Sequence, residues 1–446
     1  MNLPDGPKTS PSVQTIQFLL RPLETLDTWS QQHGDTFRLL GRELPALVYF
    51  SSPDAIQTIF TSEPEYLSST QKSNVVKLLL GEHSLIFLSG DSHQRQKRLL
   101  MPPFHGERMR EYGQTICAIT EQVISQWTCG KIFSVRSTMK EISLSVILSA
   151  VFGLQNGHRY EQLKELLTSM LEVLDYPLNS ILLFIPFLRQ DLGSWSPWGS
   201  FIRQLQQIDQ LVYAEIFERR AQSDPLRRDI LSLLLSVRDE DGQPMTDTEL
   251  RDELMTLVFA GYETTTAALS WALYWVHYLP EIQEKLLGEL GELSSGSDPS
   301  AVDRLPYLTA VCQETLRLYP IALSTFARTV QKPFEVCGYQ LQPDTIVNVS
   351  IYLAHHREAV YPEPKQFRPE RFLARQFSPF EYLPFGGGSR RCIGAALAQF
   401  EMKLVLATIL SRRQLALISP RPLKPIRRGI TMTPPSNLEM VVTKVI

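Results

Sequence analysis

The sequence predicts a mainly α-helical protein with a small β lobe, an α+β fold formed by one domain over residues 1–446. Helical hydrophobic patterns dominate from Gln114 to Val302. Short strand-like runs lie in two distant stretches, about residues 35–62 and 323–360, and we expect them to pair into one β-rich lobe. No Ser/Gly-rich linker or charge run divides the 446 residues, so a multidomain arrangement is disfavoured.

Composition narrows the function classes. A formal charge of −3 and 43% hydrophobic residues are typical of a globular protein with an ample core. The near-neutral charge argues against nucleic-acid binding, which needs a concentrated basic face. The five scattered cysteines fit a reducing compartment, and the first residues lack a basic n-region and an apolar h-region. We therefore expect a cytoplasmic protein without a signal peptide or transmembrane anchor.

The β lobe begins with two short strands. Thr36–Leu40 and Ala46–Phe50 read as strands around a turn, and Ser52 caps a helix with Pro53 at its first position. Strand-like sequence returns at Pro333–Tyr352.

A long helix is expected to begin at the capping box Thr246-x-x-Glu249 and to reach His277. Its roughly 30 residues would span about 45 Å, enough to cross a domain. The alternative is a transmembrane span from Leu254 to Leu279. An ionisable group at the bilayer centre costs about 3 kcal/mol, and no Lys/Arg cluster flanks the segment.

The middle of this helix reads Ala260-Gly261-Tyr262-Glu263-Thr264. Gly261 would let the helix open locally, while Thr264 would donate a hydrogen bond to the Ala260 carbonyl. An opened turn with an alcohol beside a carboxylate holds water well. In the alternative interpretation, Gly261 and the threonine form only a packing notch.

A glycine-rich loop from Phe385 to Gly394 carries the clearest chemical signal. Three glycines leave little bulk, so the loop backbone could approach a flat ligand closely. Cys392 follows just ahead of an expected helix, whose N-terminus favours a thiolate. With no CxxC or His nearby for zinc, one thiolate suits haem iron, which brings its other ligands. A glycine turn followed by a buried cysteine is the alternative.

The spacing Phe385-x-x-Gly388-x-Arg390-x-Cys392-x-Gly394 resembles the haem-ligand loop of the cytochrome P-450 family, and residues 260–264 resemble its helix signature. The resemblance implies the family fold, a triangular helical prism around a buried haem b. It makes Cys392 the iron ligand and places three residues at the haem: Phe385, Gly394 and Ala260. It makes Thr264 the alcohol and Glu263 the acid of proton delivery.

The same resemblance implies four partners for the haem propionates. His93 and Lys97 lie four apart on an expected basic helix, although a solvated basic face is the alternative. The family more often has Arg at the second position, so Lys97 would supply a point charge instead of a fork. Arg328, after the strand-like Leu323–Ala327, and Arg390 complete the set.

A buried ion cluster is expected to support the cysteine loop. Glu314 and Arg317 share one helix face, and the resemblance adds Arg371 from a later loop. We interpret this trio as structural; an exposed pair of no consequence is the alternative.

The resemblance implies a haem-thiolate monooxygenase that inserts one oxygen atom from O2 into a C–H bond. The segment Met101–Met109 is similar to cyanobacterial members linked to fatty acids, alkanes and terpenoids. We therefore expect a long-chain apolar substrate, a fatty acid or alkane. A terpenoid or other cyclic natural product, a peroxide-driven enzyme and a haem sensor without turnover remain alternatives.

Electrons must come from separate proteins, because the chain has no flavin or iron–sulfur motif. We expect a ferredoxin and a ferredoxin reductase-type donor, docking on the cysteine side near Arg98, Arg108 and Arg391. The apolar run Ile181–Leu188 could form an entrance that also contacts a membrane surface, or could simply pack against other helices. Family position assigns pocket lining to these residues: Val75–Phe87, Leu171–Leu188, Phe259, Ala260, Ala322, Leu323, Phe326 and Leu438.

Overall fold

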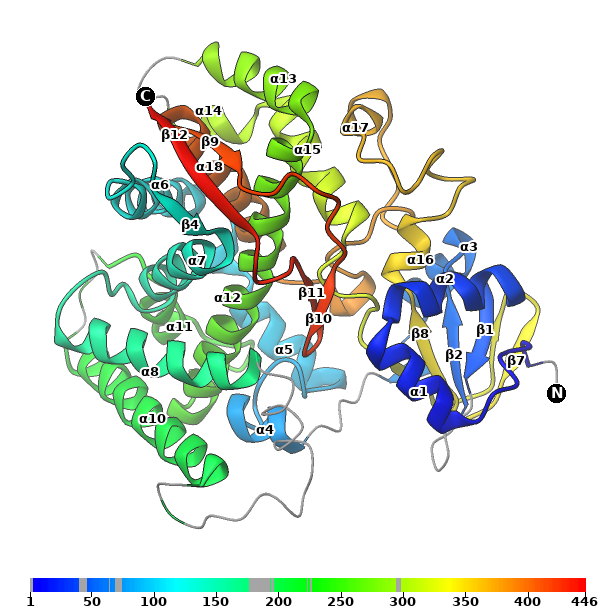
Figure 1. Cartoon of the computed structure of the whole chain (residues 1–446). Coiled ribbons are helices and arrows are strands. Elements are labelled where there is room, and N and C mark those ends of the chain that lie inside the picture. Colours follow the sequence, from blue (N-terminus) through cyan, green and yellow to red (C-terminus); the bar gives the residue numbers. More distant parts are fainter. Residues whose placement is uncertain are drawn as a thin grey trace. The chain divides into compact units, whose positions relative to one another are not determined.

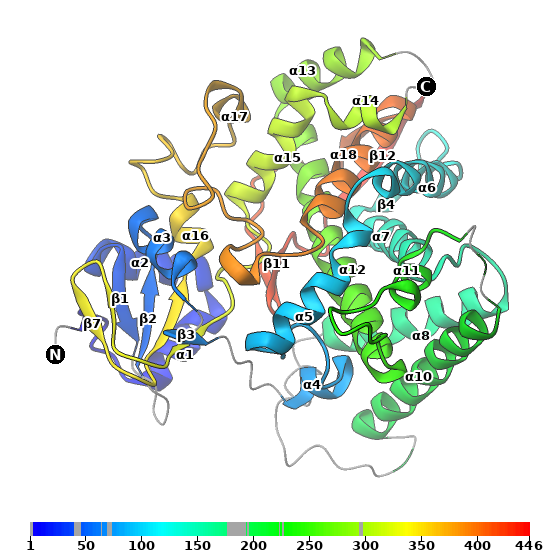
Figure 2. The ribbon, with the colours of Figure 1, turned by 180° about the vertical axis from the view of Figure 1, so that it is seen from behind.

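The computed structural model describes residues 3–39, 46–63, 65–68, 74–175, 193, 196–222, 224, 227–293 and 298–446 (Figures 1 and 2). The chain divides into two compact units. The smaller unit comprises Met1–Gln71, Leu305–Ala395 and Ile430–Thr433, and the larger unit comprises Lys72–Arg304, Ala396–Gly429 and Pro434–Ile446. Widely separated parts of the sequence therefore build each unit.

The smaller unit contains most of the short strands. Its helices are α1 Pro11–Leu20, α2 Pro22–His33, α3 Pro53–Thr61, α15 Pro306–Leu318, α16 Ile351–His355, α17 Glu370–Ala374 and the 3-10 turn η3 Gly388–Arg390. Its strands are β1 Thr36–Leu39, β2 Leu47–Phe50, β3 Leu67–Ser68, β5 Arg328–Val330, β6 Phe334–Val336, β7 Tyr339–Leu341, β8 Ile346–Val349 and β11 Thr431–Thr433.

The larger unit is mainly helical. Its helices are α4 Asn74–Leu80, α5 Gly90–Leu100, the 3-10 turn η1 Pro102–Phe104, α6 Glu107–Ile124, α7 Val135–Phe152, α8 His158–Asp175, α10 Pro197–Ala221, α11 Ile230–Ser236, α12 Asp247–Tyr278, α13 Pro280–Gly291, α14 Pro299–Asp303 and α18 Ala395–Arg412, which starts at the unit boundary. Its strands are β4 Ile132–Ser134, β9 Arg413–Leu417, β10 Ile426–Arg428 and β12 Glu439–Val445.

A five-stranded sheet organises the smaller unit, in the order β1-β2-β8-β5-β3. β2 runs parallel to β8, with Leu47 opposite Ile346 and Phe50 opposite Val349 (Figure 1). This pairing confirms that the two distant β-rich stretches combine. As predicted, α3 begins at Pro53, with the Ser52 hydroxyl accepting the Ala55 N–H at 3.4 Å.

The 32-residue helix α12 begins at the predicted capping box. The Thr246 hydroxyl oxygen accepts the Glu249 N–H at 3.2 Å, and the Glu249 carboxylate accepts the Thr246 N–H at 2.8 Å. The helix is regular through Gly261, so the expected local opening is absent. A β-carbon on Gly261 would lie 2.9 Å from Ile147 Cδ1, so this glycine serves close packing against α7. The packing-notch interpretation is therefore the better one.

Three details of the predicted β structure were wrong. Leu323–Ala327 is not a strand but makes only isolated bridges, and the strand β5 begins at Arg328 itself. Ile351 and Tyr352 belong to helix α16, because the Ser350 hydroxyl caps it by accepting the Leu353 N–H at 3.3 Å. The larger unit also holds a three-stranded sheet, β4-β12-β9, which was not predicted, because β4 lies some 300 residues before its partner β12.

Within the described ranges, every helix is too short or too polar to cross a bilayer.

Candidate active site

The glycine-rich loop of the smaller unit packs against α3. A β-carbon on Gly387 would lie 2.1 Å from the Phe60 ring, and one on Gly388 would lie 2.7 Å from the Phe60 carbonyl oxygen. Gly386 and Gly388 also have positive φ values of 66° and 65°. The glycines therefore permit the loop's shape and its close packing on protein atoms. The predicted reason for the glycines, a close approach of the loop to a flat ligand, is not needed to explain why glycine occupies these positions.

The loop presents the Cys392 thiol at the surface of the chain. The Cys392 N–H donates to the Phe385 carbonyl at 3.0 Å, and the Arg391 N–H donates to Gly388 at 3.2 Å. The Cys392 side chain is exposed, and α18 begins three residues later. Among the described residues, no protein atom lies within 4 Å of a β-carbon built on Gly394. The backbone at Gly394, two residues after the cysteine, thus faces open space.

Three influences act on the pKa of the Cys392 thiol. Although solvent reaches the Cys392 residue, the protein atoms packed around its sulfur partly desolvate it and raise the pKa of the thiol, because desolvation disfavours the charged thiolate. The Gly394 N–H and the Arg391 charge lower it, as the expected helix-start position suggested, but burial outweighs them. A bound metal cation reverses this balance, since it deprotonates a coordinating thiol.

Two guanidinium groups lie close together in the same unit. Arg328 is buried, with its Nη1 donating to the Ile59 carbonyl and its Nη2 to the Gly387 carbonyl at 3.4 Å. Burial lowers the pKa of Arg328 to about 10, and the charge of Arg390 contributes. Burial also lowers the pKa of Arg390 to about 10. Two like charges that are partly desolvated favour a nearby anion, and haem carries two carboxylates.

The expected ion trio is confirmed in the smaller unit. Arg317 donates to both carboxylate oxygens of Glu314, at 2.6 and 2.8 Å, and Arg371 Nε donates at 3.1 Å. Glu314 and Arg317 are fully buried, so the alternative of an exposed pair is wrong. Arg317 also donates to three backbone carbonyls: His355, Pro364 and Gln366.

A histidine missed at the sequence level connects this trio to the cysteine loop. Arg317 Nη1 donates to the His355 carbonyl at 2.8 Å, and the His355 ring Nε2 accepts the Leu383 N–H at 2.9 Å. The Leu383 carbonyl in turn accepts the Gly386 N–H at 3.0 Å. Burial and the Arg317 charge hold the pKa of His355 well below its usual range, so the ring stays a neutral acceptor. A helical histidine carries no local pattern that would have revealed this role.

The remaining predicted residues lie in the larger unit, on α12 and α5. The Thr264 hydroxyl donates to the Ala260 carbonyl at 2.6 Å, as predicted. Glu263 instead faces α7, where its Oε1 accepts from Arg136 Nη2 at 2.7 Å. His93 is only 5% exposed, so the alternative of a wholly solvated basic face does not hold for it. Lys97 is half-buried.

One stripe of α7 holds this part of α12. Arg136 pairs with Glu263, the Lys140 ammonium lies 5.9 Å from the Tyr262 ring centroid, and the Ser143 hydroxyl donates to the Tyr262 carbonyl at 3.4 Å. Their spacing of i, i+4 and i+7 places them on one helical face. The spacing could have predicted that these three polar residues share one face of α7, but nothing in the sequence indicated that this face contacts α12.

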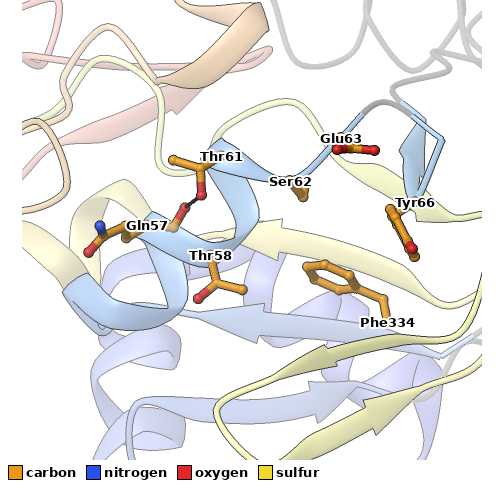
Figure 3. Close-up of a pocket in the computed structure, with 7 residues that line it drawn as sticks. All are labelled: Gln57, Thr58, Thr61, Ser62, Glu63, Tyr66 and Phe334. Carbon is orange, nitrogen blue, oxygen red and sulfur yellow. Dashed lines mark hydrogen bonds between the residues drawn. The ribbon is translucent and has the colours of Figure 1, made fainter.

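A pocket of about 460 Å³ lies in the smaller unit, apart from the predicted residues. Figure 3 shows its hydroxyl-bearing side chains on α3 and the rings of Tyr66 and Phe334 beside them. Its lining consists of Gln57, Thr58, Thr61, Ser62, Glu63, Tyr66 and Phe334. None of the predicted site residues contributes. The predicted entrance Ile181–Leu188 lies outside the described residues.

Comparisons with known proteins agree on one family. The family model described as Cytochrome P450 matches residues 4–441. Cytochrome P450 135B1 of Mycobacterium tuberculosis is 35% identical over 435 residues, which cover 97% of this chain and 90% of that protein. Cytochrome P450 138 of the same organism is 31% identical and covers 98% and 95%.

Solved structures show the same fold. A cyanobacterial CYP120A1 with bound retinoic acid superposes with a TM-score of 0.86 at 25% identity, covering all of both chains. The haem domain of cytochrome P450DA superposes with a TM-score of 0.85 at 22% identity, covering 99% of this chain and 97% of that one. The chain therefore belongs to the cytochrome P450 family, whose members are haem-thiolate monooxygenases.

Proposed function

We propose that this P450 hydroxylates a long apolar chain, a fatty acid or alkane, with electrons from separate redox proteins. The observation that carries the reaction is the Cys392 loop, which presents an accessible thiol, with open space at Gly394 and with the buried Arg328 and half-buried Arg390 guanidiniums in the same unit. For the substrate class, the support is the structural likeness to a P450 whose structure holds retinoic acid, a long apolar carboxylic acid.

Each predicted residue has a role in this proposal. Cys392 would hold the iron of haem b, whose bound form supplies the chemistry of O2 activation. Phe385, Gly394 and Ala260 would lie beside the macrocycle. The propionates would be offset by four cations or donors: His93, Lys97, Arg328 and Arg390.

Thr264 and Glu263 would manage protons. The Thr264 hydroxyl gives its hydrogen to the Ala260 carbonyl, so its lone pairs can accept a hydrogen bond from water. Glu263 is tied to Arg136, so it must exchange that partner before it can pass a proton toward Thr264. This arrangement favours an O2-dependent reaction over the peroxide-driven alternative.

The Thr264→Val variant tests the assignment of the alcohol. Valine keeps the shape but cannot hold the water, so we expect the product formed per electron consumed to fall about tenfold or more. NADPH consumption and product are measured together with a reconstituted ferredoxin system. Unchanged coupling would remove Thr264 from the mechanism.

The electron donor is proposed to be a ferredoxin with its reductase, guided by basic side chains. Arg391 is exposed, whereas Arg98 pairs with Glu240 and Arg108 donates to the Arg228 carbonyl. Arg391→Glu should therefore slow haem reduction at low salt more than Arg98→Glu does. Equal, salt-independent rates for both variants would argue against this surface.

A terpenoid substrate is the second candidate, favoured by the isoprenoid nature of the retinoic acid in the neighbouring structure. A panel of fatty acids, alkanes and terpenoids decides between the two, using the visible spectrum of the haem as the readout of binding. A shift with terpenoids alone would overturn the fatty-acid proposal. Membrane contact by Ile181–Leu188 stays a prediction that vesicle flotation would test, with an unbound protein contradicting it.

A further inference from the structure

One buried turn of α12 contacts two other elements of the larger unit through charged side chains. Arg251 and Asp252 are 5% and 3% exposed, unusually low values for ionised groups. Arg251 reaches α10, while Asp252 reaches the segment Gly81–Leu88 between α4 and α5, called segment 81–88. Figure 1 shows α12 running through the larger unit, with α10 and α4 labelled near it.

The contact with α10 is an ion pair. Arg251 Nε donates to Asp209 Oδ1 at 2.7 Å, and Nη2 lies 2.6 Å from the same oxygen. The third guanidinium nitrogen, Nη1, donates to Asp252 Oδ1 at 3.1 Å. One planar cation thus holds two carboxylates from two helices at fixed positions, which an ammonium group could not do equally well.

The contact with segment 81–88 uses the other oxygen of Asp252. Asp252 Oδ2 accepts the His83 backbone N–H at 3.0 Å. Gly81 has φ +87°, and a β-carbon there would lie 1.9 Å from the Asp252 carboxyl carbon. Only glycine therefore lets the segment turn this closely over the carboxylate.

A second attachment lies one helical turn further on. The Thr256 hydroxyl is within 2.7 Å of the Ser84 hydroxyl and 2.6 Å of the Asp252 carbonyl. Thr256 and Ser84 are both buried. Segment 81–88 is consequently fastened to α12 by polar bonds at two successive turns.

These contacts form a continuous path: Asp209 carboxylate, Arg251 guanidinium, Asp252 carboxylate, His83 N–H. Because Arg251 and Asp252 are shielded from water, each depends strongly on its partners for compensation of charge. Losing Asp209 would leave Arg251 bound to Asp252 alone, and the shared geometry would relax.

We propose that Arg251 and Asp252 couple α10 to segment 81–88, so that the order of this segment depends on the position of α10. They are positioning residues and do not contact the reacting atoms. The consequence for substrate rests on the proposed function and on the expectation from family position that Val75–Phe87 lines the pocket. The coupling itself rests only on the contacts above.

A matched control exists in the same pair of helices. Arg220 of α10 donates to Asp247 Oδ1 of α12 at 2.8 Å, but neither residue contacts segment 81–88 through the bonds described. Asp247→Asn therefore weakens an α10–α12 ion pair without disturbing the path. Asp209→Asn weakens the Asp209–Arg251 ion pair on the α10 side, without changing a residue that contacts segment 81–88 through the bonds described.

The test is hydrogen exchange of the haem-loaded full chain, read by mass spectrometry in peptides that cover segment 81–88. We expect Asp209→Asn to accelerate exchange in this segment about tenfold, because the variant loses a charge-assisted hydrogen bond to Arg251. Asp247→Asn should leave the exchange rate of the segment unchanged. Equal exchange in the two variants would overturn the coupling. Should Asp209→Asn fail to fold, Arg251→Lys replaces it, with the same expected acceleration and the same overturning result.

Binding of dodecanoic acid separates this inference from the proposed function. The coupling predicts that Asp209→Asn raises the spectroscopic Kd about tenfold while Asp247→Asn does not. If dodecanoic acid fails to bind the unaltered protein but exchange still differs between the variants, the coupling stands and the fatty-acid proposal falls.

Discussion

The ion pair of Glu263 with Arg136 determines how readily this carboxylate can take part in proton transfer. Sequence placed it beside Thr264 as an acid, and the structure shows its carboxylate paired with Arg136 of α7 at 2.7 Å. Arg136 and Glu263 are 6% and 18% exposed, so the pair lies largely away from solvent. Release of Glu263 therefore has an electrostatic cost that depends on α7.

Arg136→Leu tests that cost. Removing Arg136 takes a charged partner at 2.7 Å from the mostly buried Glu263 carboxylate, so we expect the free energy of unfolding to drop by about 3 kcal/mol. The double variant Arg136→Leu/Glu263→Gln should recover part of the loss, because the carboxylate charge is then removed together with the guanidinium charge. Urea denaturation of the three proteins measures this, and a double variant that is no more stable than the single one would contradict the account.

At the residue scale, sequence could supply residue types and spacings but not partners. The Thr264–Ala260 hydrogen bond was predictable because it lies within one helical turn. The Arg136–Glu263 pair was not, since 127 residues separate its members. The glycines at 386–388 were recognised as special, but the packing of Gly387 and Gly388 against Phe60 depends on tertiary structure.

The elements around the cysteine loop act as one hydrogen-bonded support. Helix α15 supplies Glu314 and Arg317, helix α16 supplies His355, and the His355 ring accepts the N–H of Leu383, two residues before the loop. The support thus extends beyond the ion trio to a neutral imidazole. The sequence pattern predicted the Glu314–Arg317 pair and the family resemblance added Arg371, whereas the imidazole was found only in the structure.

His355→Leu should destabilise this support. A buried Leu383 N–H without an acceptor costs about 1–3 kcal/mol, and we expect the variant to release haem more readily. His356→Leu is the matched control, because the His356 ring bonds only within its own helix, to the Tyr352 carbonyl at 2.8 Å. Haem transfer to apomyoglobin measures retention, and equal transfer from both variants would show that His355 does not support the loop.

For the whole molecule, burial of ionisable groups sets how stability varies with pH. Burial raises the pKa of Glu253 and of Glu401 to about 8 from 4.5. Between about pH 4.5 and pH 8, both carboxyls therefore keep a proton in the folded state, whereas the same groups are deprotonated in the unfolded state. Stability falls as pH rises through that window. Buried His277, with a pKa lowered to about 4 from 6.5, acts oppositely but only below pH 6.5.

The free energy of unfolding should therefore decrease between pH 6.5 and about pH 8, where Glu253 and Glu401 lose their protons in the folded state and His277 no longer contributes. The variant Glu253→Gln/Glu401→Gln should show a flatter profile in the same range. Denaturation at several pH values compares the unaltered chain with this double variant. Glu284→Gln, at an exposed position, is the control for loss of a glutamate that is not buried. A variant profile as steep as that of the unaltered chain would refute the assignment of these two groups.

For the whole molecule, the fold class was predictable from the sequence, but the pairing of strands that lie far apart in the sequence was only partly predictable. The joining of residues near 47 and 346 into one sheet followed from two separated β-rich stretches. The β4-β12-β9 sheet did not, because Ile132–Ser134 sits among helices and its partner Glu439–Val445 lies some 300 residues away. Short strands surrounded by helical sequence carry too little periodicity to be recognised.

Every role proposed for the site depends on one bond, between the thiolate of Cys392 and haem iron. The most direct measurement is the absorption spectrum of the dithionite-reduced protein after carbon monoxide is added, for the unaltered chain and for Cys392→Ala. The account predicts the red-shifted band of thiolate coordination in the former and its loss in the latter. A band typical of imidazole coordination, or an unaltered spectrum in Cys392→Ala, would contradict it.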